Sequence, residues 1–325
     1  MAFTDLQPDE LRAYAPALAG PDDLEAFWAA TLAETRAHDL DARFTPIDTG
    51  LTVLESFDVS FAGFGGTRIR GWLHLPVGGS GDRLPAVVEF IGYGGGRGLA
   101  HERTLFAQAG HAQLVMDTRG QGSGWSVGDT PDPDPTGAPA QPGFLTRGIL
   151  DPREHYYRRV YSDAVRAVEA VRAHPRVDPS RVAVTGGSQG GAITLAVAGL
   201  VPDLVGAAPD VPFLCDIERA IGIVDTEPYA ELTRYLAAHR DHRAMALQTL
   251  RYVDAARLGR LATAPSLFSV GFMDDVCPPS TVFAAYHAYG GPKEIHEYPE
   301  NGHEGGGPFH DRVKLAWLAD RFGAD

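Results

Sequence analysis

A serine between glycines is the residue of this sequence best suited to nucleophilic chemistry. Ser188 lies in Gly186-Gly187-Ser188-Gln189-Gly190, which matches the pattern Gly-x-Ser-x-Gly. The residues before it, Arg181–Thr185, are mostly apolar or β-branched and predict a strand, and a helical pattern, Gln189–Leu200, follows at once. A strand, a sharp turn and a helix in this order present a reactive serine, and glycines fit where the chain folds back. The alternative is a glycine-rich turn whose serine only caps the helix.

A serine hydroxyl needs a general base, and the chain offers one histidine in a suitable place. His303 follows the predicted strand Glu294–Tyr298 directly, within a glycine-rich loop that can deliver an imidazole to the strand ends. We therefore expect His303 to be the base. The other histidines after Ser188 fall in predicted helices, in a strand or in a charged stretch: His239, His242, His287, His296 and His310.

The base in turn needs a carboxylate that orients it, and two aspartates are candidates. Asp274 and Asp275 come shortly after the predicted strand Pro265–Gly271. Successive side chains that leave a strand point in opposite directions, so only one of the two can face His303. The spacing does not choose between them, and the other aspartate is expected to be a solvent-facing turn residue.

Two backbone amides are expected to receive the negative charge that develops on a carbonyl oxygen under attack. One is the amide of Gln189, directly after the serine. The other is the amide of Tyr93, in the glycine-rich loop Gly92–Gly96 that follows the predicted strand Pro85–Ile91. A glycine-rich loop after a strand also occurs in dinucleotide-binding oxidoreductases. That alternative is weaker, because the loop matches Gly-x-Gly-x-x-Gly poorly.

Strands that alternate with helices must position these residues. This alternation predicts an α/β fold with a doubly wound, mostly parallel sheet covered on both faces. A hairpin (51–61 and 67–75) and a first helix (21–37) precede it. The remaining predicted strands are Pro85–Ile91, His111–Asp117, Arg181–Thr185, Pro265–Gly271 and Glu294–Tyr298, and the helices are His155–His174, Gln189–Leu200 and Thr281–Tyr289.

Two stretches break the alternation within what we expect to be a single domain (1–325). Residues 122–150 are rich in Gly, Pro and Asp without periodicity, which predicts a functional loop or an interface arm, the alternative being a flexible surface loop. Residues 213–261 have helical spacing throughout and predict a helical cap inserted over the carboxyl ends of the strands. The alternative for the second stretch is a set of extra helices at the sheet edge.

Charge and composition exclude several classes of protein. The 325 residues carry 28 basic and 42 acidic side chains, a net charge of −14, which argues against nucleic acid and anionic membranes as partners. Only two lysines, Lys293 and Lys314, are present, and there is no P-loop. Cys215 and Cys277 form no CxxC, and the first residues lack the pattern of a signal peptide. We therefore expect a cytoplasmic protein without a metal or cofactor.

Four motifs in order resemble one enzyme family. Arg119-Gly120-Gln121 is similar to its RGQ signature, Gly186–Gly191 to its GxSQG signature and His303-Glu304 to its HE signature, and Cys277–Tyr286 is also similar. The family is that of the acetyl xylan esterases and cephalosporin C deacetylases, carbohydrate esterase family 7. The resemblance spans nearly the whole chain.

The resemblance implies an α/β-hydrolase that removes acetyl groups from small acetylated carbohydrates, such as xylo-oligosaccharides, and from cephalosporin C. It assigns Ser188 as nucleophile, Asp274 as acid and His303 as base, with the amides of Tyr93 and Gln189 as oxyanion hole. It also implies an intracellular, metal-independent homohexamer, a trimer of dimers, in which residues 122–150 form an interface arm.

Further residues are expected to support the site. Arg119 and Gln121 are expected to brace nearby loops, and Glu304 belongs to the same set of motifs. We expect the substrate pocket to include Tyr93, Pro228 and Cys277. The alternatives are a general short-chain carboxylesterase, a peptidase of the same fold, or a catalytically inactive protein that only binds ligands.

Overall fold

The computed structural model describes residues 5–78, 83–133 and 143–323. Within them, nine strands form one sheet in the order β1-β2-β3-β5-β4-β6-β7-β8-β9. Strands β1, β2, β3 and β5 pair antiparallel, and the pairs from β5 to β9 are parallel. The strands are β1 (Arg43–Ile47), β2 (Leu54–Ala62), β3 (Arg68–Pro76), β4 (Leu84–Phe90), β5 (Ala112–Met116), β6 (Val177–Gly187), β7 (Gly206–Asp210), β8 (Ser266–Gly271) and β9 (Lys293–Tyr298). The predicted hairpin and mostly parallel α/β sheet are confirmed.

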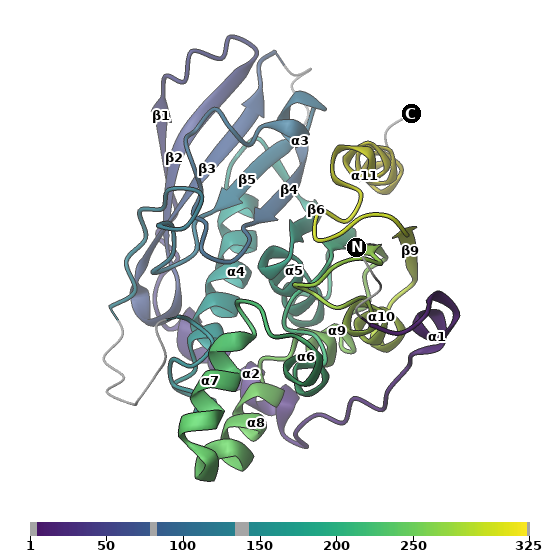
Figure 1. Cartoon of the computed structure of the whole chain (residues 1–325). Helices are drawn as coiled ribbons and strands as arrows, with labels where there is room; N and C mark the ends of the chain where they lie inside the picture. The colour runs from purple at the N-terminus through teal and green to yellow at the C-terminus, as the bar shows by residue number, and fades with distance from the viewer. Residues whose placement is uncertain (1–4, 79–82, 134–142, 324–325) are drawn as a thin grey trace.

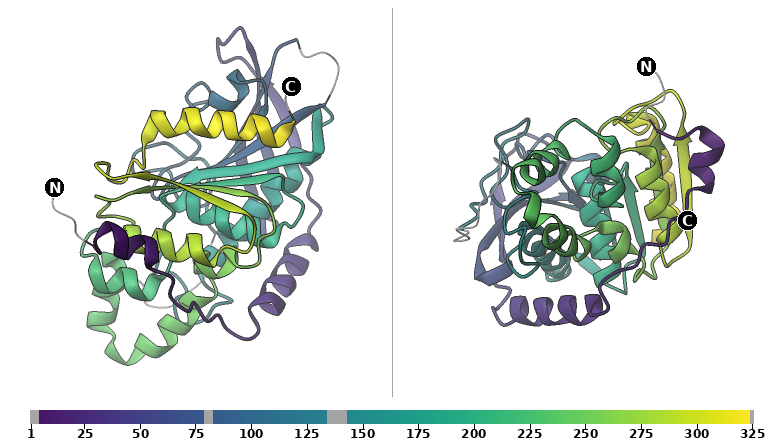
Figure 2. Two further views of the ribbon diagram at one scale, coloured as in Figure 1. Left: turned by 90° about the vertical axis from the view of Figure 1, so that its right-hand side faces the viewer. Right: turned by 60° about the horizontal axis from the view of Figure 1, so that its bottom comes forward.

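Helices cover both faces of this sheet (Figures 1 and 2). One layer consists of α4, α5, α9 and α10, with α2 against α4, and the opposite face carries α3 and α11. The helices are α1 (Pro8–Ala13), α2 (Leu24–Arg36), α3 (Leu105–Gln108), α4 (Tyr156–Arg172), α5 (Gln189–Leu200), α6 (Ile217–Ile223), α7 (Ala230–Ala238), α8 (Arg243–Arg251), α9 (Ala255–Gly259), α10 (Pro279–Ala288) and α11 (Gly307–Phe322), with 3₁₀ turns η1 (Phe64–Gly66) and η2 (Arg240–His242).

The sequence of β4 explains why the sheet needs two helical layers. Successive side chains of a strand point to opposite faces. Ala86 and Val88 belong to the larger apolar core, which includes α4 and α5, whereas Val87 packs in a second core with Phe106 of α3 and Trp317 of α11. All three β4 residues are fully buried. A continuous apolar run of this kind is typical of a parallel strand covered on both sides.

Two strands have no counterpart in the sequence prediction. β7 reads Gly-Ala-Ala-Pro-Asp, which lacks the β-branched and aromatic residues that mark strands. It forms because β6 and β8 pair with it on both sides and bury it. β1, also unpredicted, is a mostly exposed edge strand with a proline, a residue that edge strands tolerate.

The structure describes all of residues 213–261 but only part of residues 122–150. Residues 213–261 contain α6, α7, α8 and α9. α9 packs against α5, so closely that a Cβ at Gly199 would lie 2.1 Å from the carbonyl oxygen of Leu258. α7 and α8 extend away from the sheet, at the lower end of the molecule in Figure 1. In the stretch 122–150, residues 134–142 lie outside the described residues, and the described remainder forms neither helix nor strand.

Both lysines are engaged with other groups. Lys293 donates hydrogen bonds to the carbonyl oxygens of His287 and Tyr289, each 2.8 Å away, at the end of α10. Lys314 of α11 is buried and forms an ion pair with Asp210 at the end of β7. Among the helices that the structure describes, none is long and apolar enough to cross a membrane.

Candidate active site

Ser188 stands at the sharp turn between β6 and α5. Its backbone has φ 57° and ψ −118°, a conformation that costs energy for any residue with a side chain. Two contacts hold the turn: the Ser188 amide donates to the carbonyl oxygen of Asp210 at 2.9 Å, and the Phe213 amide donates to the Ser188 carbonyl oxygen at 3.0 Å. The strand, turn and helix lie where the sequence predicts them.

The glycines around this serine permit a very close approach of three backbone segments. A Cβ at Gly190 would lie 2.2 Å from the carbonyl oxygen of Phe90, the last residue of β4. A Cβ at Gly186 would lie 2.6 Å from the carbonyl carbon of Gly190. Any larger residue at either position must therefore displace the turn that presents the serine.

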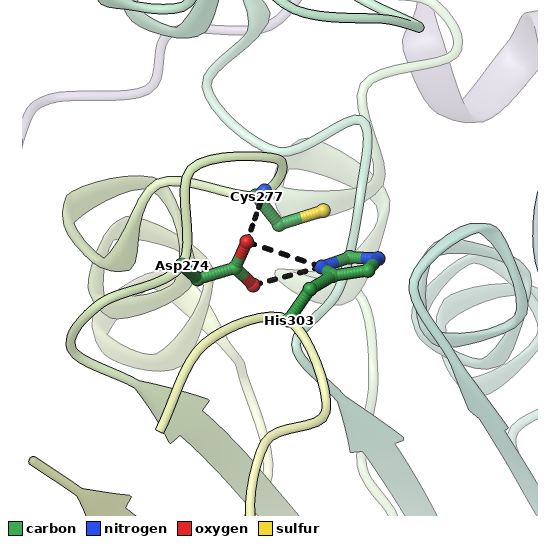
Figure 3. Close-up of side chains that lie close together, drawn as sticks. All are labelled: Asp274, Cys277 and His303. Atoms are coloured by element: carbon green, nitrogen blue, oxygen red, sulfur yellow. Dashed lines mark hydrogen bonds and ion pairs between the residues drawn. The ribbon is translucent and has the colours of Figure 1, made fainter. Parts of the chain in front are cut away.

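His303 is paired with Asp274 (Figure 3). Its Nδ1 lies 2.9 Å from Oδ2 and 3.1 Å from Oδ1 of Asp274. The Asp274 side chain is only 1% exposed, and its Oδ1 accepts hydrogen bonds from the amides of Val276 and Cys277, both at 2.8 Å. This network orients the carboxylate, which holds the imidazole with Nδ1 protonated and leaves Nε2 available as a base.

The second aspartate of the pair lies elsewhere. Asp275 is exposed, and its backbone carbonyl oxygen accepts a hydrogen bond from the Thr226 hydroxyl at 3.1 Å. Asp274, and not Asp275, is therefore the aspartate that contacts His303 in the structure. The family resemblance assigns the role of acid to the same residue.

Ser188 and His303 line the same cavity of about 480 Å³. Tyr93 and Pro228, both expected in the substrate pocket, also line it, as does Glu304. Cys277 is not among its lining residues. It is fully buried, and its Sγ lies 4.0 Å from Ser188 Oγ, so it packs beside the nucleophile.

The amides of Tyr93 and Gln189 are free to bind an oxyanion. Neither donates a hydrogen bond within the part of the chain that the structure describes. Gln189 is the first residue of α5, and the amides of a helix's first turn have no partner inside the helix. The positive end of the helix dipole also favours negative charge at this position.

The side chains of Gln121 and Gln189 tie the loops of these two amides together. Gln121 Nε2 donates to Gln189 Oε1 at 2.8 Å, and Gln121 Oε1 accepts from the Gly94 amide at 2.7 Å. Gln189 Nε2 donates to the carbonyl oxygen of Ile91 at 3.0 Å. The two glutamines thus hold the Tyr93 loop from both sides.

The neighbouring motif residues brace the loops around the cavity, and of them only Glu304 also lines it, among the described residues. Arg119 is buried and forms a two-pronged ion pair with Asp163 of α4, at 2.6 and 2.7 Å. Gly120 has φ +69°, and a Cβ there would lie 2.8 Å from Asp132. Glu304 accepts hydrogen bonds from Asn301 at 2.6 Å and from the Gly302 amide at 3.0 Å, which lowers the pKa of its carboxyl.

Asp274, Cys277 and His303 also meet the spacing of a metal site, since their ligand atoms lie within 4.8 Å of one another. Their chemistry fits a metal poorly. Burial raises the pKa of the Cys277 thiol well above its usual value, whereas a metal binds the thiolate. The Asp274 carboxylate and His303 Nδ1 are already hydrogen-bonded to each other. The arrangement is better suited to moving a proton.

Three side chains at or behind the cavity wall are not predicted from the sequence. Glu231 of α7 accepts a hydrogen bond from the Tyr93 hydroxyl at 2.5 Å. Trp125 and Arg103 line the cavity itself. No motif marks these residues. Trp125 lies in the glycine-rich stretch after β5 and Glu231 in the helical insertion, whereas Arg103 lies between β4 and α3, where the sequence gives no signal.

A doubly wound sheet, a serine at a strained strand-to-helix turn and an Asp–His pair whose histidine lines the same cavity as the serine define an α/β-hydrolase. A comparison with protein-family models supports a narrower assignment, because residues 1–321 match the acetyl xylan esterase (AXE1) family. The chain belongs to this family.

Solved structures and a curated relative are similar to this chain. An acetyl xylan esterase from Paenibacillus sp. R4 is 36% identical with a TM-score of 0.92, covering 97% of this chain and 99% of that one. Acetyl xylan esterase 1 from Thermoanaerobacterium sp. JW/SL YS485 is 30% identical with a TM-score of 0.90, over 98% and 99%. Acetyl esterase Axe7A of Xylanibacter ruminicola is 29% identical over 91% of this chain, which spans 66% of that protein's length.

Proposed function

We propose that this protein is an acetyl xylan esterase that removes acetyl groups from small acetylated xylo-oligosaccharides through an acetyl-enzyme intermediate. The observation that carries the proposal is the contact between His303 Nδ1 and Asp274, with the imidazole and Ser188 in one cavity. Family membership and the acetyl xylan esterases among its relatives support the acetyl group as the one removed.

In the first half of the reaction, Ser188 Oγ attacks the acetyl carbonyl carbon and gives its proton to His303 Nε2. The carbonyl oxygen becomes an oxyanion that accepts hydrogen bonds from the amides of Tyr93 and Gln189. The bond between the acetyl carbon and the sugar oxygen then breaks, and the sugar leaves with the proton from His303. Asp274 stabilises the imidazolium that exists between these steps.

In the second half, a water molecule gives a proton to His303 and attacks the acetyl carbon of the acetyl-serine. The same two amides receive the second oxyanion. When the bond to Ser188 Oγ breaks, the serine regains its proton from His303 and acetate leaves.

The proposal extends to three properties that rest on the family resemblance. Cephalosporin C is a second acetyl ester that the enzyme is proposed to accept. The protein is proposed to be cytoplasmic and to assemble as a homohexamer, to which residues 122–150 contribute. Light scattering measures the mass of the assembly, and a monomer in solution would reject the proposed hexamer.

The test is hydrolysis of p-nitrophenyl acetate and acetylated xylobiose by Ser188→Ala. We expect the rate to fall by several orders of magnitude, and a brief reaction of the wild type should add the mass of one acetyl group to Ser188. Ser180→Ala, an exposed serine near the start of β6, is the matched control and should retain full activity. Near-normal rates in Ser188→Ala would reject the mechanism.

The acid is tested separately by replacing each aspartate of the pair. Asp274→Asn should lower kcat by roughly 10⁴-fold, because the imidazole then loses its orienting charge and its correct tautomer. Asp275→Asn should have little effect, since its side chain is exposed. A larger loss of kcat in Asp275→Asn than in Asp274→Asn would show that Asp275, and not Asp274, is the acid.

A further inference from the structure

The cavity at Ser188 shares lining residues with two neighbouring cavities, and one arginine lines all three. Arg103 lines the catalytic cavity of about 480 Å³ and also two neighbouring cavities of about 660 and 430 Å³. Trp125 lines the catalytic cavity and the larger neighbour, and Glu89 lines the catalytic cavity and the smaller one. These three side chains therefore lie between neighbouring cavities, and all three line the cavity that Ser188 also lines.

Trp125 offers a fixed and open aromatic surface at this junction. Its side chain is 58% exposed although it is one of the largest apolar groups of the protein. Its Nε1 donates to the carbonyl oxygen of Tyr93 at 2.8 Å, and its ring lies against Gly92 and Gly95, where a Cβ would be 3.4 and 2.5 Å from ring atoms. Backbone contact on one side and exposure on the other suit the ring for stacking.

Arg103 and Glu89 add hydrogen-bonding groups next to this ring. Arg103 Nη1 donates to Glu89 Oε1 at 2.9 Å, and the guanidinium lies 5.5 Å from the centre of the Trp125 ring. The other N–H groups of Arg103 have no acceptor within the described residues, and its side chain is 30% exposed. A planar group with several donors matches neighbouring hydroxyls on a ring, because two of its N–H groups can bind two oxygens at once.

The charges around the junction favour an uncharged ligand. The positive charge of Arg103 is matched by Glu89, and the carboxylates of Glu102 and Glu304 also line these cavities, together with Glu227, which is paired with Arg234. Negative side chains repel an anionic ligand, and the protein as a whole carries a charge of −14. A neutral polyol ring has C–H groups for the negative face of an indole and hydroxyls for the guanidinium and carboxylate.

We propose that Trp125, Arg103 and Glu89 form the subsite that binds the uncharged pyranose ring of the leaving group, and so favour acetylated neutral sugars over acetyl esters that carry a carboxylate. This proposal rests on the proposed esterase activity, because it assigns the alcohol side of the same reaction. Ser188 determines whether an ester is cleaved, and the three residues determine which ester is held.

The test compares kcat/KM for acetylated xylobiose with kcat/KM for ethyl acetate, whose alcohol has no ring. In Trp125→Ala the ratio of the two should fall by about three- to tenfold, the range expected for one aromatic stacking contact. Trp125→Phe should keep the ratio within about twofold, since it retains a ring but loses the hydrogen bond to Tyr93. Met245→Ala, a residue of α8 that is 56% exposed, should leave the ratio unchanged.

Trp125→Phe and Trp125→Ala together distinguish an indole that stacks on the sugar from one that only supports the Tyr93 loop. If the indole only braces the Tyr93 loop, both variants will lose activity on both esters, and the ratio will stay constant. That outcome would overturn the proposal. Arg103→Ala should lower the ratio by about three- to tenfold through the lost hydrogen bonds, and an unchanged ratio there would remove Arg103 from the subsite.

Charge selectivity gives an independent readout with cephalosporin C, which carries a carboxylate. Relative to ethyl acetate, its kcat/KM should rise when the ionic strength is raised from about 0.05 M to about 0.5 M, because salt screens the repulsion. A fall would contradict the assignment of a neutral ligand. In one pair of results, Ser188→Ala abolishes all hydrolysis while Trp125→Ala leaves the xylobiose-to-ethyl-acetate ratio of kcat/KM unchanged. That pair of results would reject this subsite and still support the esterase function.

Discussion

Glu231 offers a strong test of how the helical insertion supports the oxyanion hole. The residue lies at the start of α7, is 4% exposed, and accepts hydrogen bonds through both carboxylate oxygens. Oε1 accepts from the Tyr93 hydroxyl at 2.5 Å and Oε2 from the Leu145 amide at 3.1 Å. The Tyr93 hydroxyl also accepts from the Phe144 amide at 2.8 Å. One carboxylate thus joins the helical insertion, the loop that contains Leu145 and the oxyanion loop.

The magnitude follows from the groups that lose their partner. In Glu231→Ala, the Tyr93 hydroxyl and the Leu145 amide have no acceptor, and each such buried group costs about 1–3 kcal/mol, so the free energy of unfolding should fall by roughly 2–6 kcal/mol. The Tyr93 amide should also move, and loss of one oxyanion donor sets an upper limit of about 10²–10³-fold on the fall in kcat. Glu231→Gln retains one acceptor oxygen and should lie between Ala and wild type.

The assay combines urea unfolding with steady-state kinetics on p-nitrophenyl acetate. We expect kcat to fall more than KM changes, because an oxyanion donor acts on the transition state. In a Tyr93→Phe background, Glu231→Ala should cost about half of what it costs alone, since the contact with Tyr93 is already lost and only that with the Leu145 amide remains. Glu218→Ala, in a half-exposed ion pair with Arg251 in the same insertion, is the control. Additive effects of Tyr93→Phe and Glu231→Ala, or an unchanged kcat in Glu231→Ala, would refute the reasoning.

Two further predictions concern stability. Burial lowers the pKa of both His74 and His155 from 6.5 to about 4, so the unfolded chain binds protons first as the pH falls. The free energy of unfolding should therefore be at its full value above about pH 6.5 and be lower by roughly 2 kcal/mol per histidine at about pH 5. Urea unfolding measures this, and a free energy of unfolding that does not change with pH would contradict the prediction. Asp163→Ala leaves the buried charge of Arg119 without its main partner and should lower the free energy of unfolding by about 3–5 kcal/mol. Arg43→Ala, which breaks an exposed ion pair, should lower it by less than about 1 kcal/mol. Equal losses of stability in the two variants would show that burial does not decide the cost.

Local patterns were enough to predict the elements that carry the reactive groups. The strand, turn and helix around Ser188 follow from apolar β-branched residues, glycines and a helical run that are neighbours in the sequence. The prediction of helices in 213–261 rests on the same kind of periodicity, and α6–α9 are found there. β7 was missed because its small residues carry no strand signal, and the strand depends on pairing with β6 and β8.

Contacts between distant segments were beyond the reach of such patterns. The choice between Asp274 and Asp275 depends on a turn in which the amides of Val276 and Cys277 hold one carboxylate, and spacing along the chain does not contain that information. The bond between Tyr93 and Glu231 joins residues 138 positions apart. Each partner alone is an ordinary tyrosine or glutamate, and only the fold brings the two together.

The scarcity and engagement of the lysines have a practical consequence for handling this enzyme. Lys314 is buried against Asp210, and Lys293 donates to two backbone carbonyl oxygens, so the described chain presents few ammonium groups to reagents. Coupling to aldehyde or succinimidyl supports, which consume primary amines, should therefore be inefficient over residues 5–78, 83–133 and 143–323. Carbodiimide coupling through the abundant surface carboxylates is the better route to an immobilised catalyst.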